Sequence, residues 1–374
     1  MRLQEMSDDV RFAEGQSDSH SDAEPARLLG SESVPGVCGQ LPAMPRDLSG
    51  KMSDDASNHY LAGEYDAAEA MLREAIAIAP DLAEAHANLG VLLLTKGEYK
   101  QGFREFEWRW KLPAFVQDTP KKLRGDFWDG RHGEKSASLF VHAEQGYGDT
   151  IHMARYAIAA QQTGMQVTLS VQPELLRLLE TLPVHHVQAT HHPIPDFDYH
   201  CPLMSMPLAM EGLIGYTIPF AHGYIPSLPA LTQRWRTKLD AAGFGVGPNI
   251  GIAWKGNPAF AMDRNRSVFL AEIMHARGLP EGRYFSLQKG GSEEAEVHGL
   301  IDWTAECVDF ADTAALIANM DMVITTETAV AHLAGAMNKP THIVLPAVPD
   351  WRWGLSGHKS VWYSSVTLHR REKR

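Results

Sequence analysis

DMVITTETAVAHLAGAMNKP, at residues 321–340, decides the fold of this chain. The apolar run at 322–325 predicts a buried strand, the small-residue pattern at 328–337 predicts a helix, and 341–345 predicts a second strand. Strand, helix and strand in this order form the unit from which parallel sheets are built. The stretch therefore predicts an α/β fold.

The same alternation continues toward the N-terminus. We predict two Rossmann-like halves, at residues 136–245 and 246–374, joined near the GFGVGP turn at 243–248. Their strand ends are expected to face each other across a cleft, which is where open α/β sheets bind ligands. The other predicted elements are strands at 138–142, 166–171, 249–254 and 285–288 and near Val187 and Tyr199, and helices at 150–163, 173–182 and 313–320.

A short all-α segment precedes the two halves, at residues 51–115. Within it, Gly63-Glu64-Tyr65 aligns with Gly97-Glu98-Tyr99 at a shift of 34, which resembles the tetratricopeptide repeat. Because isolated repeats need a neighbour to bury their apolar face, we expect this segment to pack on the following domain. Its aromatic residues are either that contact or ordinary core, and they are Phe106, Trp108 and Trp110. Residues 1–50 are rich in Ser, Asp, Glu, Gly and Pro and are predicted to be disordered.

Composition excludes several classes of protein. The formal net charge of −12 argues against a nucleic-acid partner, because phosphate binding requires a basic surface. The chain has no apolar run of the roughly 20 residues that a membrane-spanning helix needs, and its N-terminus has no apolar signal-peptide core. Three cysteines without CxxC spacing and scattered histidine pairs predict neither disulfides nor a metal site. We therefore expect a cytoplasmic protein.

The loop HAEQGYGD at 142–149 joins a predicted strand to a predicted helix. Gly146 and Gly148 permit tight turns and close approach of a ligand to the backbone. Asp149 is placed where it can accept a proton from a hydroxyl in the cleft. It is equally placed to be the N-cap of the helix, and the two roles are compatible.

A second cluster follows the strand at 322–325. The helix that starts after Thr328 offers free N–H groups to an anion such as a diphosphate. His332 lies one turn further on, where it either faces the same ligand or serves as a satisfied structural histidine. Two more strand ends are expected at the same cleft: the loop with Lys255, Asn257, Arg264 and Arg266, which either neutralises phosphate or is solvated, and Gln288, placed to touch a nucleoside.

Five motifs together resemble a bacterial family of tetratricopeptide-repeat proteins with a C-terminal glycosyltransferase domain of the B architecture (GT-B). This family is related to glycosyltransferase family 9 and the heptosyltransferases and, more distantly, to protein O-glycosyltransferases. The resemblance covers about residues 53–370. The motifs are HAEQGYGD at 142–149, WKGNP at 254–258 followed by RS at 266–267, DTAALI at 312–317, TETAVAHLAGA at 326–336, and DWRWG…WY at 350–363.

The resemblance implies that Asp149 is the catalytic base and that the donor is held without a metal or other cofactor. It departs from the family pattern at Glu327, where Asp is usual, and at Ser364, where Pro is common. The predicted acceptor-binding residues are Glu144, Gln145 and Gly146. The predicted donor-binding residues are Lys255, Asn257, Arg266, Gln288, Thr326, Glu327, Thr328 and His332.

The predicted function is transfer of a sugar from a nucleotide sugar to a hydroxyl of a glycan, a lipid-linked glycan or a protein. The repeat segment is expected to contact a protein partner or the acceptor. The alternative is a repeat-containing scaffold with an inactive transferase domain, which the Glu327 departure and the low repeat count keep open. An oxidoreductase is disfavoured because no GxGxxG follows a predicted strand.

Overall fold

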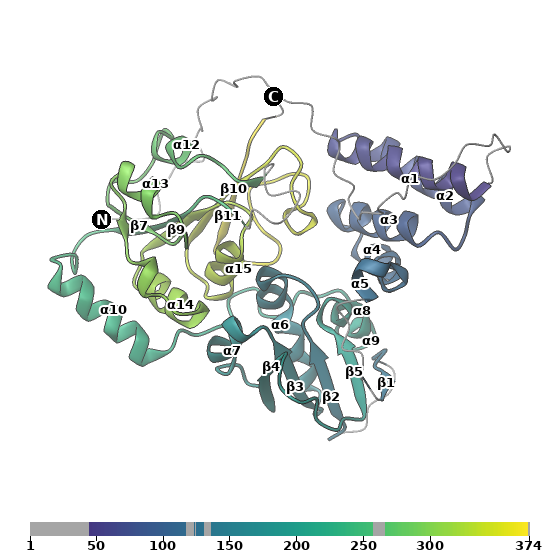
Figure 1. Cartoon of the computed structure of the whole chain (residues 1–374), viewed down its shortest axis with the longest axis horizontal. Coiled ribbons are helices and arrows are strands. Elements are labelled where there is room, and N and C mark those ends of the chain that lie inside the picture. The colour runs from purple at the N-terminus through teal and green to yellow at the C-terminus, as the bar shows by residue number, and fades with distance from the viewer. Residues whose placement is uncertain (1–44, 117–122, 124, 131–135, 257–265, 373–374) are drawn as a thin grey trace, which may run out of the picture.

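The structure is a computed structural model, and it describes residues 45–116, 123, 125–130, 136–256 and 266–372. It consists of a helical segment followed by two α/β halves (Figure 1). No helix in these ranges is long and apolar enough to cross a membrane. The same ranges contain no cluster of three or more His, Cys, Asp or Glu residues that is suited to a metal ion.

The helical segment is built from two helical hairpins. Its second and fourth helices begin at Tyr65 and Tyr99, which are 34 positions apart, and Gly63 and Gly97 provide the left-handed turns before them (φ 69° and 81°). The first helix already begins at Pro45, so the predicted disorder up to residue 50 is wrong for 45–50, and 1–44 lie outside the described residues. The elements are α1 (Pro45–Leu61), α2 (Tyr65–Ile78), α3 (Ala83–Thr95), α4 (Tyr99–Phe106), the 3₁₀ helix η1 (Glu107–Lys111) and α5 (Pro113–Val116).

The first half is a parallel sheet in the order β1-β5-β2-β3-β4. Its central strand is almost wholly buried, as expected for a parallel strand covered on both faces. The edge strand β1 (Asp126–Phe127) was not predicted, because two residues carry no detectable periodicity. The other elements are β2 (Ser138–His142), α6 (Tyr147–Gln162), β3 (Gln166–Val171), α7 (Pro173–Leu179), β4 (His186–Ala189), β5 (Tyr199–Pro202), η2 (Leu203–Ser205), α8 (Met206–Ala209) and α9 (Glu211–Ile214).

The second half is a parallel sheet in the order β11-β10-β9-β6-β7-β8. Counted from β6, this is the 3-2-1-4-5-6 order of doubly wound nucleotide-binding sheets, so the predicted fold class is confirmed. The strand predicted at 285–288 lies two residues earlier, at β7 (Arg283–Ser286). The remaining elements are β6 (Asn249–Ala253), α12 (Leu270–Met274), α13 (Ser292–Val297), β8 (Ile301–Asp302), η3 (Thr304–Glu306), α14 (Phe310–Ala318), β9 (Met322–Thr325), α15 (Ala329–Ala336), β10 (Thr341–Leu345), η4 (Trp351–Trp353) and β11 (Val366–Arg370).

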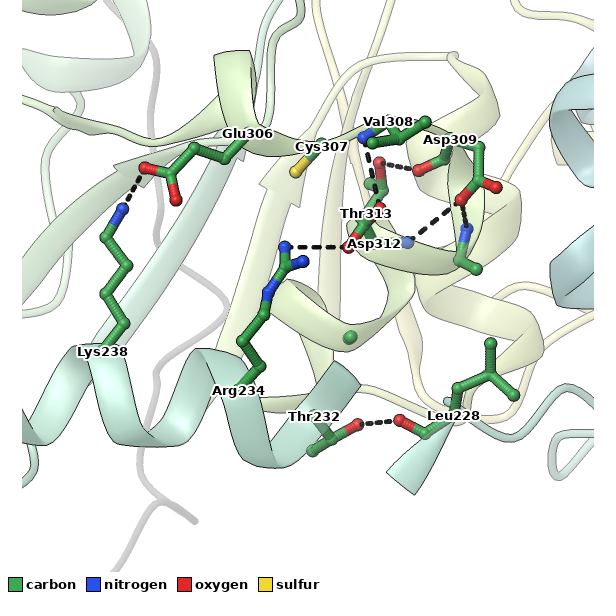
Figure 2. A network of polar contacts seen from close by, with 12 residues as sticks. Leu228, Thr232, Arg234, Lys238, Glu306, Cys307, Val308, Asp309, Asp312 and Thr313 are labelled. Carbon is green, nitrogen blue, oxygen red and sulfur yellow. Dashed lines mark hydrogen bonds and ion pairs between the residues drawn. The ribbon is translucent and has the colours of Figure 1, made fainter. Parts of the chain in front are cut away.

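Helix α10 (Pro229–Ala241) precedes the predicted boundary at 245 but packs on the second half. The amide of Asn319 donates to the carbonyl of Thr232 at 3.0 Å. Figure 2 shows Arg234 reaching Asp312 of α14 and Lys238 reaching Glu306 of η3. The second half therefore includes α10.

One apolar core runs through all three parts of the chain, from Phe103 and Phe106 of the helical segment to both sheets. The two halves meet where α6 lies against α15 (Figure 1). At this contact a Cβ atom on Gly148 would lie 3.0 Å from Cδ2 of His332, so only glycine fits without displacing its neighbour. The first turns of the two helices are thus held together.

Candidate active site

The predicted site residues follow the strands at which each sheet reverses its order. In the first sheet this switch lies between β2 and β5, and in the second it lies between β6 and β9. Ligands of doubly wound sheets bind at the carboxyl ends of the strands at this point. Asp149 follows β2, Lys255 follows β6, and Thr326 follows β9. Topology therefore places the predicted base and part of the predicted donor site at the two switch points.

Asp149 is the third residue of α6, and Gly146 is the N-cap. The N-cap role considered for Asp149 is therefore wrong, although its Oδ2 still accepts a hydrogen bond from the N–H of Gly146 at 3.0 Å. Its Oδ1 forms an ion pair with Arg352, a residue of the second half. Burial raises the pKa of Asp149 above its ordinary value, and the Arg352 guanidinium opposes that rise.

Arg352 lies in η4, and its side chain is only 6% exposed. Its Nη1 donates to both carboxylate oxygens of Asp350, at 2.8 and 3.0 Å, and its Nε donates to Nδ1 of His152 at 3.1 Å. Arg352 is not among the site residues predicted from the sequence, although it lies in the DWRWG motif at 350–354. The feature of the sequence that could have pointed to Arg352 is its position between two tryptophans, in a motif that has no other assigned role.

Glu327 occupies the loop between β9 and α15, and it is buried. Its Oε1 accepts a hydrogen bond from the N–H of Asp350 at 2.9 Å. Burial, together with the negative charge of Asp350, raises the pKa of Glu327 to about 8. Glu327 therefore anchors the segment that carries Arg352.

The other predicted donor residues of this loop surround the N-terminus of α15. Thr326 is fully buried, and its Oγ1 has no hydrogen-bond partner among the described residues. Thr328 is the N-cap residue, and its hydroxyl lies 3.1 Å from that of Thr325. His332 is bonded to the hydroxyl of Tyr363 at 3.0 Å, and burial followed by the Arg352 charge moves its pKa well below the ordinary value. These contacts fit the structural alternative for His332, and its donor role stays a prediction.

The strand-end residues of β6 and β7 are partly engaged with one another. Oε1 of Gln288 accepts hydrogen bonds from the backbone N–H groups of Trp254 and Lys255, at 3.2 and 2.9 Å. The Lys255 ammonium is half-exposed and pairs with Glu294. Asn257 and Arg264 lie outside the described residues. Gln288 thus holds the end of β6 in place, beside the exposed Lys255 cation.

Arg266 is a further charged residue that acts on Glu327, which is buried, and on Asp149, whose side chain is 23% exposed. Burial has the largest effect on both, and the positive charge of Arg266 also acts on the pKa of Asp149 and of Glu327, in the downward direction. The charge of this predicted donor residue therefore acts on the predicted base.

Two of the predicted acceptor residues, Glu144 and Gln145, form hydrogen bonds within the protein. Glu144 is buried and accepts two hydrogen bonds from Arg109 of η1, at 3.0 Å each, and one from the N–H of Met204 at 2.8 Å. The carbonyl of Gln145 accepts from the side chain of Gln172 at 2.7 Å. Glu144 therefore connects the loop after β2 to the helical segment, and acceptor contact by these residues stays a prediction.

The last helices of the helical segment pack on the first half as expected. Phe106 joins the common core, and the indole N–H of Trp110 points to the hydroxyl of Ser205 at 3.4 Å. Trp108 differs, because it stacks on His86 within the segment itself, with ring centroids 3.8 Å apart. Both alternatives considered for these aromatics are thus realised, in different residues.

Comparison with known proteins gives the following similarities. No family model matches the chain. Protein FlbA of Caulobacter vibrioides is 27% identical over 319 residues, which cover 76% of this chain and 52% of FlbA, so the chain spans about half the length of this curated relative. A glycosyl transferase of family 9 from Veillonella parvula aligns with 64% of this chain and 87% of its own, at 10% identity and a TM-score of 0.48. The ADP-heptose lipopolysaccharide heptosyltransferase II of E. coli aligns with 62% of this chain and 90% of its own, at 14% identity and a TM-score of 0.45.

Proposed function

We propose that the chain is a glycosyltransferase that moves a sugar from a nucleotide-sugar donor to a hydroxyl group of an acceptor. The observation that carries the proposal is the position of Asp149. This carboxylate lies at the switch point of one parallel sheet and is paired with Arg352 of the other half. Two doubly wound halves with an acid at their junction suit a reaction between two substrates, one bound by each half.

The donor is proposed to bind at the second half, with its diphosphate at the N-terminus of α15. The free N–H groups of a helix N-terminus and the positive charges of Lys255 and Arg266 stabilise an anion there. These groups perform the charge neutralisation that the departing nucleotide diphosphate requires. A metal ion is not part of the proposal.

The proposed chemistry is a single displacement. The acceptor hydroxyl oxygen forms a bond to the anomeric carbon of the sugar, the bond from that carbon to the diphosphate oxygen breaks, and the hydroxyl proton passes to Asp149. Both oxygens of Asp149 already accept a hydrogen bond, one from Gly146 and one from Arg352. Each oxygen has a second lone pair, which remains for the incoming proton.

The helical segment is proposed to be a pair of tetratricopeptide repeats that binds a protein partner or the acceptor. The observation in favour is the repeat of a helical hairpin with the same glycine turn after 34 residues.

A thermal-shift screen with UDP, GDP, ADP and CMP tests the donor side of the proposal. A ligand that binds only the folded state raises the free energy of unfolding, by about 2.7 kcal/mol at a ligand concentration of 100 Kd, and Tm rises with it. The expected result is stabilisation by one of these nucleotides, retained in Asp149→Asn and in the exposed control Asp196→Asn. No shift with any nucleotide would favour the inactive scaffold instead.

A further inference from the structure

We propose that Arg352 is a positioning residue for Asp149: it bridges the two halves, fixes the orientation of the carboxylate and balances its charge. This inference rests on the proposed function, in which Asp149 accepts the proton. It gives a role to the DWRWG motif at 350–354, to which the sequence alone assigns none.

The guanidinium of Arg352 uses its whole planar fork. Nη2 is directed to Asp149, Nη1 to Asp350 and Nε to His152. One face of the guanidinium lies over the ring of Trp351, 4.4 Å from its centroid. A fork that is held at three edges and one face has one position, so it presents Asp149 with a fixed partner.

His152 contributes a neutral acceptor to this arrangement. Burial, followed by the nearby charge of Arg155, moves its pKa well below the ordinary value, so the imidazole is uncharged at neutral pH. Its Nδ1 therefore accepts the hydrogen bond from Nε of Arg352, at 3.1 Å. His152 and Asp149 lie on the same face of α6, three positions apart, so one helix holds Arg352 at two points.

The second half holds Arg352 equally firmly. Asp350 accepts the N–H of Arg352 at 3.0 Å, and the N–H of Asp350 in turn donates to Glu327. Trp351 packs edge-on against Phe103 of the helical segment, with ring centroids 5.8 Å apart. All three parts of the chain therefore determine where Arg352 lies.

The charges around Asp149 show why a cation is needed there. The side chain of Asp149 is 23% exposed, and its partial burial, followed by the negative charge of Asp350, raises the pKa of Asp149. The positive charges of Arg352 and Arg266 lower the pKa of Asp149, and the nearby His152 and His332 are uncharged. Loss of the Arg352 charge is therefore expected to leave Asp149 protonated at a pH where a base must be ionised.

The test is the pH dependence of kcat/KM with the nucleotide sugar whose nucleotide stabilises the protein. In Arg352→Gln the acid limb of the profile is expected to move upward by about one to three pH units. Arg352→Lys keeps the charge but loses the fork, so it should keep the acid limb and lower kcat by about tenfold or more. An acid limb in Arg352→Gln that coincides with that of the wild-type protein overturns the inference.

Arg370→Gln is the matched control, because Arg370 holds the same C-terminal segment without contacting Asp149. It donates to the carbonyls of Trp353, Gly354, Ser356 and Gly357. The acid limb of the pH profile of Arg370→Gln should coincide with that of the wild-type protein. If this limb moves as far as it does in Arg352→Gln, the inference is also overturned. If Arg352→Gln does not fold, Arg352→Lys decides alone, since an unchanged kcat excludes a role in positioning. Absence of turnover by the wild-type chain is a separate result, because it rejects the proposed function itself.

Discussion

Glu144 and Arg109 form a two-bond ion pair that joins the loop after β2 to the helical segment. Their side chains are 4% and 0% exposed, and each of the two hydrogen bonds measures 3.0 Å. Glu144 lies in the loop that leads into α6, five residues before Asp149. The helical segment therefore holds the loop that precedes the candidate base, whether or not it also binds a partner.

Glu144→Gln is expected to destabilise the protein. The buried Arg109 loses one of its two carboxylate partners and keeps Glu107, at 2.7 Å, so the loss should stay below the roughly 3–5 kcal/mol of a fully uncompensated buried charge. The double variant Arg109→Met/Glu144→Leu removes both charges and should recover much of that loss. Urea denaturation of the three proteins measures the effect, and equal stability of Glu144→Gln and wild type would contradict the assigned contact.

Glu327→Gln is expected to change the pH dependence of stability. The pKa of Glu327 is raised from 4.5 to about 8 in the folded state, so the folded state binds the proton more tightly. Its contribution to stability is therefore complete below about pH 4.5 and is lost as the pH rises through about 8. We expect Tm to fall between pH 6 and pH 9 in the wild-type protein, and to fall by a few degrees less in Glu327→Gln. Thermal melts of both proteins across this pH range measure the difference. An identical fall in Tm in the two proteins would contradict the raised pKa of Glu327.

Gly148→Ala is expected to disturb the contact between α6 and α15. The new methyl group would lie 3.0 Å from the ring of His332, and that ring is held by stacking on Trp353 with centroids 5.1 Å apart. We expect a lower Tm, by overpacking of about 1–3 kcal/mol, and a lower kcat. Gly212→Ala is the control, because nothing lies within 4 Å of its added methyl. Equal melting temperatures and rates for the two variants would show that the contact tolerates displacement.

Asp312→Asn is expected to loosen the connection between the halves at α14. The Asp312 carboxylate is buried and pairs with Arg177 of the first half, at 2.6 Å. It also pairs with Arg234 of α10, at 3.0 Å, as Figure 2 shows. Replacing the charge weakens both pairs, so Tm should fall by several degrees at low salt and by less at high salt. The single variant Arg234→Gln leaves the Arg177 contacts in place and should show a smaller fall. A full-sized fall in Arg234→Gln would place the stabilisation in α10 alone.

Local patterns in the sequence were sufficient for most of the fold. Apolar runs identified β2, β6 and β9, and the 34-residue repeat identified the helical hairpins, because each signal lies within a few turns of chain. The two-residue strands β1 and β8 carry no such signal, and they form only because a neighbouring strand pairs with them. The boundary of α10 was missed because its partners lie on α14, far along the chain.

Only those residues of the candidate site that follow a predicted strand could be predicted from the sequence. Asp149 and Thr326 follow apolar strands and were found in this way. The ion pair of Asp149 with Arg352 joins residues 203 positions apart, and the pair of Glu144 with Arg109 joins residues 35 positions apart. No local spacing encodes such contacts, so the ion pair of Arg352 forms only when the two halves pack together, and that of Glu144 only when the helical segment packs on the first half.

The central claim is tested most directly by sugar transfer with the wild-type protein and Asp149→Asn, measured as release of nucleotide diphosphate with and without cell-extract glycans as acceptor. We predict release by the wild-type protein that the acceptor stimulates, loss of at least about a hundredfold in Asp149→Asn, and unchanged nucleotide binding in both. Near-normal release by Asp149→Asn would contradict the assignment of the base, and no release by either protein would contradict the proposed transferase.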